Sequence, residues 1–206
     1  MHKIRNIFPT PVYITKRDSD LIPREEKEIE KIIKSGMYKN AGNSTSNNSD
    51  IFNGKLKKLK QFCEQHIKIY VEQIIKPKEK LDFYITQSWI NVTKPGEFHH
   101  EHHHSNSIIS GVFYISTEED DRIEFGDHVG IVKHRLKITP KEFNLWNSTS
   151  WYFPVKNNEL ILFPSYLSHK VEPNEKATTD RISISFNTFV RGALGNRKEL
   201  TELILK

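Results

Sequence analysis

The region that follows Leu81 most constrains what this chain can fold into. Short stretches rich in branched and aromatic residues succeed one another, separated by turn signals such as Lys94-Pro95-Gly96 and Asn157-Asn158. Their pattern predicts strands over residues 82–92, 108–116, 122–126, 131–138, 159–163 and 181–190. Because no helical pattern interrupts them, we expect a mainly β fold with a sandwich or barrel core.

The residues before this region predict helices. Pro23 begins a helix that continues to about Lys34, since proline is favoured in the first helical turn. A second helix is predicted from Lys55 to Ile75, with Pro77 ending it. Its apolar residues recur at steps of three and four: Leu56, Leu59, Cys63, Ile67, Tyr70 and Ile74. We expect this face, including Cys63 as a small buried hydrophobe, to pack on the sheet.

Two shorter segments carry weaker signals. Residues 7–14 are predicted to be an extended edge segment, because their two prolines exclude a central strand. Asn43 to Asp50 is predicted to be a polar loop. His66 lies beside the apolar face of the second helix, so a structural role is expected for it rather than a ligand role.

Composition fits one domain covering residues 1–206, with a helical front over about 1–80 and a β core over about 81–190. Apolar runs such as Leu160 to Phe163 are too short to cross a membrane, and no signal peptide follows the basic first residues. A single cysteine excludes an internal disulfide and fits a reducing cytosol, so we expect a cytoplasmic protein, in a bacterial cytosol or a phage-infected host. The net charge of +5 includes a basic segment, Lys55 to Lys60, which favours a solvated face over a nucleic-acid site because no aromatic residues interleave the lysines.

The most chemically informative feature is a histidine cluster, His99-His100-Glu101-His102-His103-His104. In a strand, His100, His102 and His104 would point to one face, and His99, Glu101 and His103 to the other. Either face offers two ligands at alternate positions, and neutral imidazole binds iron, zinc, copper and nickel. His169, after a strand ending Phe163-Pro164-Ser165, is the remote candidate that would complete a metal site.

A second constellation follows His169 along the chain. Arg181 and Ser183 share one face of a predicted strand, where a guanidinium can hold a carboxylate through two parallel hydrogen bonds and a hydroxyl adds a third. Near a metal, this pair would hold the distal carboxylate of a 2-oxo-diacid. The same face carries Ser185 and Asn187 and is expected to line the barrel interior, while Ile182, Ile184 and Phe186 pack against the outer layer.

These residues resemble a known family. The motifs are Trp89-x-Asn91, Gly96, His102-x-His104-Ser105-Asn106-Ser107, Ser110-Gly111-Val112-Phe113-Tyr114, Phe125-x-Asp127, Leu162-Phe163-Pro164-Ser165-Tyr166-Leu167-Ser168-His169 and Arg181-x-Ser183-x-Ser185-Phe186-Asn187. Together with Phe8-Pro9-Thr10-Pro11-Val12 near the start, they resemble the 2-oxoglutarate/Fe(II)-dependent oxygenases common in phages and marine bacteria. The resemblance runs over nearly the whole chain.

The resemblance implies a double-stranded β-helix, or jelly roll, buttressed by the helices. It implies Fe(II) as cofactor, 2-oxoglutarate as cosubstrate, and hydroxylation of an unidentified substrate with release of succinate and CO2. By the same resemblance His102 and His169 bind iron, Arg181 with Ser183 binds 2-oxoglutarate, and Tyr114 is a further cosubstrate contact. No catalytic residue is expected beyond these ligands.

The identity of the third iron ligand stays open. The wider superfamily has His-x-Asp or His-x-Glu, whereas His104 stands at the carboxylate position here. Either His104 itself binds, giving a three-histidine site, or a carboxylate comes from Asp127 or from Glu101 paired with His99. His128, where relatives usually have proline, is assigned no role.

Two other classes of function compete with the oxygenase. The absent His-x-Asp carboxylate suits a non-catalytic jelly-roll module for binding or structure, and a cupin-type metal enzyme would need no oxo-acid anchor. The expected partners are O2 and a prime substrate, either a small molecule or a protein side chain, without membrane or nucleic acid, and a homo-oligomer is compatible with the sequence. Trp89, Trp146, Trp151 and Tyr152 are candidates for the substrate pocket, although the core is the favoured place for such aromatics.

Overall fold

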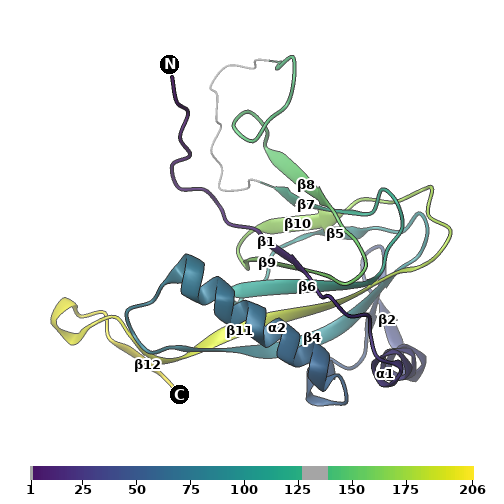
Figure 1. The fold of residues 1–206 in the computed structure, drawn as a ribbon, viewed down its shortest axis with the longest axis horizontal. Helices are drawn as coiled ribbons and strands as arrows, with labels where there is room; N and C mark the ends of the chain where they lie inside the picture. The colour runs from purple at the N-terminus through teal and green to yellow at the C-terminus, as the bar shows by residue number, and fades with distance from the viewer. Residues whose placement is uncertain (1, 127–138) are drawn as a thin grey trace.

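Two antiparallel sheets form the body of the protein in a computed structural model, which describes residues 2–126 and 139–206 (Figure 1). The larger sheet has the strand order β1 (Tyr13–Lys16), β9 (Glu159–Pro164), β6 (Ile109–Ser116), β11 (Arg181–Leu194), β4 (Asp82–Thr93), β3 (Ser44–Ser46) and β2 (Met37–Lys39). The smaller sheet has the order β5 (His99–His102), β10 (Ser168–Val171), β7 (Arg122–Gly126) and β8 (Ser150–Pro154). This architecture confirms the predicted fold class, a mainly β jelly roll with a few helices.

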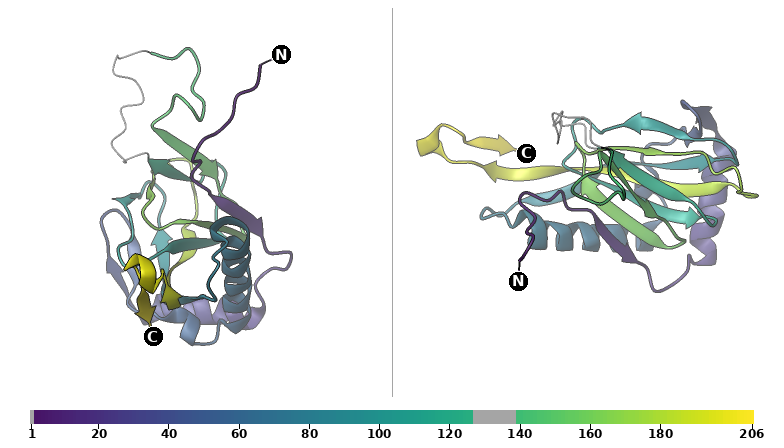
Figure 2. Two further views of the ribbon diagram at one scale, coloured as in Figure 1. Left: turned by 90° about the vertical axis from the view of Figure 1, so that its left-hand side faces the viewer. Right: turned by 90° about the horizontal axis from the view of Figure 1, so that it is seen from above.

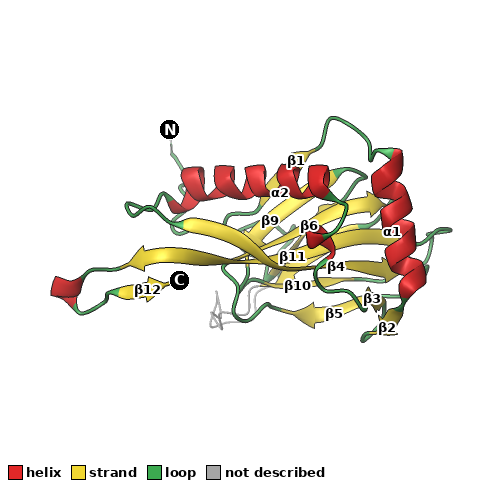
Figure 3. Ribbon diagram, turned by 90° about the horizontal axis from the view of Figure 1, so that it is seen from below, coloured by secondary structure: helices red, strands yellow, loops and turns green. Residues whose placement is uncertain are grey.

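The helices cover the outer face of the larger sheet (Figure 3). The two long ones are α1 (Pro23–Ser35) and α2 (Lys57–Tyr70), and short helical turns occur at η1 (Ile51–Asn53), η2 (Val71–Ile75) and η3 (Arg197–Glu199). Both predicted helices are therefore confirmed. In the part of the chain that the structure describes, no helix is long and apolar enough to cross a membrane.

Strand alternation divides the apolar residues of β6 and β9 between two cores. Phe113 on β6 and Leu160 on β9 pack towards the helices, together with Ile184 and Phe186 of β11. The alternate residues fill the space between the sheets and include Val112, Tyr114, Ile161 and Phe163. The larger sheet thus has apolar side chains on both faces, which explains why its strands carry almost continuous apolar runs.

The apolar face of α2 is buried as predicted, except at its end. Leu59, Cys63 and Ile67 have at most 2% of their surface exposed, whereas Ile74 is 40% exposed. The cause is the π-helical turn η2, because a wider turn rotates the following side chains away from the earlier face. Val71 is buried in place of Ile74.

Several predictions about the shorter segments were wrong. The segment Asn43 to Asp50 is not a surface loop, because it contains β3, and Asn43, Thr45 and Ser46 are buried. The Ser46 hydroxyl accepts a hydrogen bond from the backbone N–H of Ile90 at 3.0 Å, so polar residues are used here to join β3 to β4. The first edge strand begins at Tyr13, after the prolines, rather than spanning residues 7–14.

The strands of the smaller sheet were mostly missed. The sequence predicts β7 but not β5, β8 or β10, each four or five residues long. Histidine and other polar side chains dominate β5 and β10, whereas β8 carries three aromatic residues, Trp151, Tyr152 and Phe153. The strand predicted over 131–138 lies outside the described residues. At the other end of the molecule, β11 continues into a C-terminal hairpin with β12 (Leu203–Leu205), and this hairpin extends away from the sheets (Figure 2).

Replacing Gly111 with alanine is expected to lower the free energy of unfolding by about 1–3 kcal/mol, the usual cost of overpacking a core. Gly111 on β6 is the register partner of Phe186 on β11, and a Cβ at position 111 would overlap the Phe186 ring. Urea denaturation measures the effect. Combining Gly111→Ala with Phe186→Leu should recover part of the lost stability relative to the sum of the two single changes, and strict additivity would contradict this account.

Candidate metal centre

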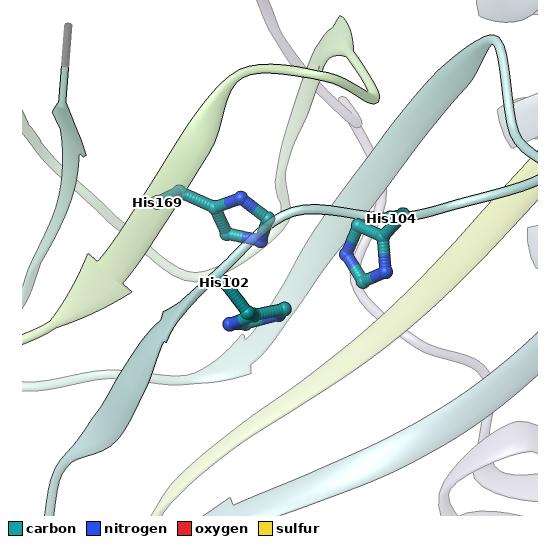
Figure 4. Close-up of side chains that lie close together, drawn as sticks. All are labelled: His102, His104 and His169. Atoms are coloured by element: carbon teal, nitrogen blue, oxygen red, sulfur yellow. The ribbon is translucent and has the colours of Figure 1, made fainter. Parts of the chain in front are cut away.

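Three histidines meet at one end of the smaller sheet (Figure 4). His102 on β5 and His169 on β10 are direct register partners, and their ring centroids lie 4.3 Å apart. His104 follows the end of β5, where its backbone N–H donates to the carbonyl of Ser165 at 2.9 Å. One ligand nitrogen from each of the three rings lies within 4.8 Å of the other two. The structure therefore brings together the three histidines that the sequence predicts as metal ligands.

Backbone carbonyls set the tautomer of two of these rings. His102 Nδ1 lies 2.8 Å from the carbonyl oxygen of His100, and His169 Nδ1 lies 3.1 Å from that of Leu167. Because a carbonyl only accepts, Nδ1 carries the proton in both rings and Nε2 keeps its lone pair. This is the arrangement found where a histidine binds a metal through Nε2.

Burial favours the neutral form of all three imidazoles. Burial, followed by the neighbouring imidazoles, lowers the pKa of His169 well below its usual value and that of His104 to about 4. Burial also lowers the pKa of His102. The rings are then neutral at neutral pH, each with one nitrogen free of a proton, as metal ligands must be.

His99 does not lie where alternation predicts it. His102 pairs with His169 and His99 pairs with Val171, so an interval of three residues on β5 lies opposite an interval of two residues on β10. Such a bulge turns the extra residue, and His99 consequently stacks on His102 with ring centroids 4.6 Å apart. Burial, then the nearby imidazoles and Arg181, lower the pKa of His99 to about 3. His99 is thus a neutral residue of the same cavity.

The two carboxylates considered as alternative metal ligands are Glu101 and Asp127. Glu101 is exposed, and its Oε1 accepts a hydrogen bond from the Ser168 hydroxyl at 3.2 Å. It is not part of the group of potential ligands found among the described residues. Asp127, the other candidate, and its neighbour His128 lie outside the described residues. Of the open choices, His104 is the one whose position the structure gives beside His102 and His169.

The predicted oxo-acid anchor lines the same cavity. Arg181 and Ser183, buried on β11, face it together with Tyr114 of β6, which the sequence predicted as a further contact. Ser185 also lines this cavity, which confirms that the polar face of β11 points inward. The structure therefore places a buried cation and hydroxyl groups in the cavity that the three histidines share.

A buried carboxylate that sequence reasoning missed accompanies Arg181. Asp121 is 5% exposed, and its Oδ1 lies 3.7 Å from Nη1 of Arg181. The backbone N–H of Glu118 and the side-chain amide of Asn174 also donate to Asp121. In the sequence Asp121 looks like one more acidic residue of a turn, so only the fold could reveal its partner. Burial lowers the pKa of Arg181, while Tyr114 and Asp121 act against this.

The aromatic residues offered as pocket candidates separate into two groups. Trp89 lines the cavity, and its ring lies 5.8 Å from that of His104. Trp146, Trp151 and Tyr152 are 54%, 37% and 53% exposed, so the favoured interpretation of these three as core residues was wrong. They lie on β8 and the segment before it, at the edge of the smaller sheet.

The residues present fit a divalent transition metal. Three neutral imidazoles with two tautomers fixed by carbonyls form a set of nitrogen donors that suits Fe(II) as well as zinc, copper or nickel. A buried guanidinium that lines the same cavity suits an anionic ligand there.

Comparison with known families gives one match. Residues 87–187 match the model of a family described as "Putative 2OG-Fe(II) oxygenase", and this range contains every residue discussed above as a metal or oxo-acid ligand. The match supports the general type of enzyme predicted from the sequence. It also confirms the predicted cofactors, Fe(II) with 2-oxoglutarate as cosubstrate. The sequence has no match among the curated proteins with which it was compared.

Solved structures with the same fold are distant in sequence. A Pseudomonas putida prolyl-4-hydroxylase is 12% identical, with a TM-score of 0.56 over 89% of this chain and 94% of that one. The epimerase SnoN from nogalamycin biosynthesis is 10% identical, with a TM-score of 0.61 over 87% and 78% of the two chains. HygX from Streptomyces hygroscopicus, solved with nickel, 2-oxoglutarate and hygromycin B, is 9% identical, with a TM-score of 0.53 over 87% and 82%. At these identities the likeness concerns the fold.

Proposed function

We propose that this chain is a 2OG-Fe(II) oxygenase that hydroxylates an unidentified prime substrate. His102, His104 and His169 would hold Fe(II), and Arg181 with Ser183 would hold the distal carboxylate of 2-oxoglutarate. The single observation that carries the proposal is that a buried arginine and three converging histidines share one cavity. The family match over residues 87–187 supports the same chemistry.

In this proposal, each group of side chains that lines the cavity has a defined role. The histidines present neutral nitrogen donors, because burial keeps the imidazoles from gaining a second proton at neutral pH. Arg181 gives two parallel N–H donors to the distal carboxylate, and the Ser183 hydroxyl adds a third. Tyr114, with 2% of its surface exposed, lies near enough to Arg181 to add a hydroxyl donor. The keto-acid end of the cosubstrate is then directed towards the histidines.

When bound, Fe(II) with 2-oxoglutarate supplies an oxidation by O2 that releases succinate and CO2. The chain contributes orientation and a cavity that limits access of water. Asp121, whose Oδ1 lies 3.7 Å from Nη1 of Arg181, would help to position the guanidinium before 2-oxoglutarate arrives. The prime substrate would be a small molecule or a protein side chain.

The two competing classes lack support from this geometry. A cupin-type metal enzyme needs no anchor for a second carboxylate, yet Arg181 is 7% exposed and lines the same cavity as the three histidines. Burying a guanidinium costs free energy, so its position beside the histidines favours a function that uses it. A non-catalytic jelly-roll module would require neither group.

Turnover of 2-oxoglutarate tests the proposal. Incubating the protein with Fe(II), 2-oxoglutarate, ascorbate and O2 should release succinate above the rate without protein. Arg181→Ala is expected to lower the rate by about 100-fold, and omission of Fe(II) should abolish it. Equal succinate release from the wild-type protein and from His169→Gln would contradict the proposed function.

A further inference from the structure

His104 differs from the other two histidines in the group that faces its Nδ1. Backbone carbonyls face Nδ1 of His102 and His169, and no substitution can remove those carbonyls. Nδ1 of His104 instead lies 3.5 Å from the side-chain amide of Asn187, with Nδ2 as the nearer atom. The tautomer of His104 therefore depends on one side chain.

Asn187 is held firmly for this task. It lies on β11 opposite Ser110 of β6 and is 9% exposed. The Ser110 hydroxyl lies 2.9 Å from Oδ1 of Asn187 and 2.9 Å from the Ser165 hydroxyl, which in turn lies 2.7 Å from the hydroxyl of Ser107. Each of these hydroxyls can act as donor or acceptor. The direction of donation along this series of hydrogen bonds can therefore reverse without movement of any heavy atom.

The two orientations of the Asn187 amide have opposite consequences for His104. With Nδ2 towards the ring, the amide donates to Nδ1, and the proton of a neutral His104 lies on Nε2. With the amide turned by half a turn, Oδ1 accepts from Nδ1–H, and Nε2 keeps its lone pair. Nδ2 then donates to Ser110, whose hydroxyl donates to Ser165, and Ser165 donates to Ser107. The Ser107 hydroxyl can donate a hydrogen bond to the carbonyl oxygen of Ile109, 3.4 Å away.

We infer that Asn187 is a positioning residue that accepts the Nδ1 proton of His104 and thereby makes its Nε2 the third metal ligand. This inference rests on the proposed function, because it concerns how the same centre is assembled. It assigns to Asn187 the role that the carbonyls of His100 and Leu167 have for the other two rings.

Two substitutions separate this role from a packing role. Asn187→Leu keeps the size of the side chain but offers no acceptor, whereas Asn187→Asp can accept from both His104 and Ser110. Titration with Co(II), followed by its d–d absorption and by calorimetry, should show Asn187→Leu weakened by about 10- to 100-fold and Asn187→Asp within a few-fold of the wild type. Asn53→Leu, the same exchange at an exposed asparagine outside the cavity, is the matched control and should bind like the wild type.

The tautomer itself can be read without any substitution. In the Zn(II)-loaded wild-type protein labelled with 15N-histidine, long-range 1H–15N spectra should show His104 with a protonated Nδ1 and a metal-bound Nε2, assigned by comparison with His104→Gln. A protonated Nε2 in that spectrum, or Asn187→Leu binding Co(II) as tightly as the wild type, would overturn the inference and leave the proposed function standing. Failure of the wild type to bind Co(II) or Fe(II) would overturn both.

Discussion

Replacing Arg181 with alanine is expected to weaken 2-oxoglutarate binding by about 100-fold or more, because two charge-assisted hydrogen bonds are lost. Metal affinity should stay within a few-fold of the wild type, since Arg181 makes no contact with the three ligand nitrogens in this account. Calorimetric titration of 2-oxoglutarate into the Co(II)-loaded protein, after a separate Co(II) titration, measures both affinities.

The Arg181→Ala variant needs controls, because Arg181 has a buried partner, Asp121. Arg181→Ala leaves Asp121 buried without its cation, which lowers stability when a charge loses its partner. Arg181→Lys keeps the charge but loses the planar pair of donors, and its affinity for 2-oxoglutarate should fall between those of the wild type and the alanine variant. Undiminished 2-oxoglutarate affinity in a folded Arg181→Ala protein would show that the cosubstrate assignment is wrong.

Loss of a metal ligand should have the second large effect. Replacing His102, His104 or His169 with glutamine is expected to weaken Co(II) binding by more than the roughly 10- to 100-fold typical of residues that only support a ligand. The three variants should behave alike, because the three nitrogens lie within 4.8 Å of one another and would share one metal ion. Anaerobic Fe(II) binding and Co(II) absorption provide the measurement.

Carboxylate variants decide which residue is the third ligand. Glu101→Gln and Asp127→Asn are the matched controls, since each removes a charge at nearly constant size, and both should retain Co(II) affinity within a few-fold. The reverse pattern, with Asp127→Asn losing the metal and His104→Gln retaining it, would refute the three-histidine centre. It would leave the roles of His102 and His169 intact.

The parts of the fold that depend on local pattern could be predicted from the sequence. Alternation along β11 correctly separates an inward polar face from the core residues Ile184 and Phe186, and the apolar spacing of α2 correctly identifies its buried side. The strands β5 and β10 of the smaller sheet could not be predicted, because their sequences carry histidine and polar residues in place of an apolar alternation. The buried segment that contains β3 was missed for the same reason, since its polar side chains look like those of a loop.

Some features of the candidate site could also be predicted from the sequence, and others could not. His102, His104, His169, Arg181 and Ser183 stand out because their residue types have few structural uses in such a pattern. The inward turn of His99 depends on a bulge between β5 and β10, which alternation in one strand cannot reveal. The partnerships of Arg181 with Asp121 and of His104 with Asn187 are tertiary contacts between residues that lie 60 and 83 positions apart. Such contacts follow from the fold and have no signature of their own.

An anaerobic titration of the wild-type protein tests the central claim most directly. If Fe(II) and 2-oxoglutarate bind together in this cavity, a metal-to-ligand charge-transfer band should appear in the visible spectrum only when both are present, and it should saturate at one equivalent of each. The band should be absent with Fe(II) alone, and Arg181→Ala should require a much higher 2-oxoglutarate concentration to develop it. A protein that binds Fe(II) fully and yet shows no band at saturating 2-oxoglutarate would contradict the claim.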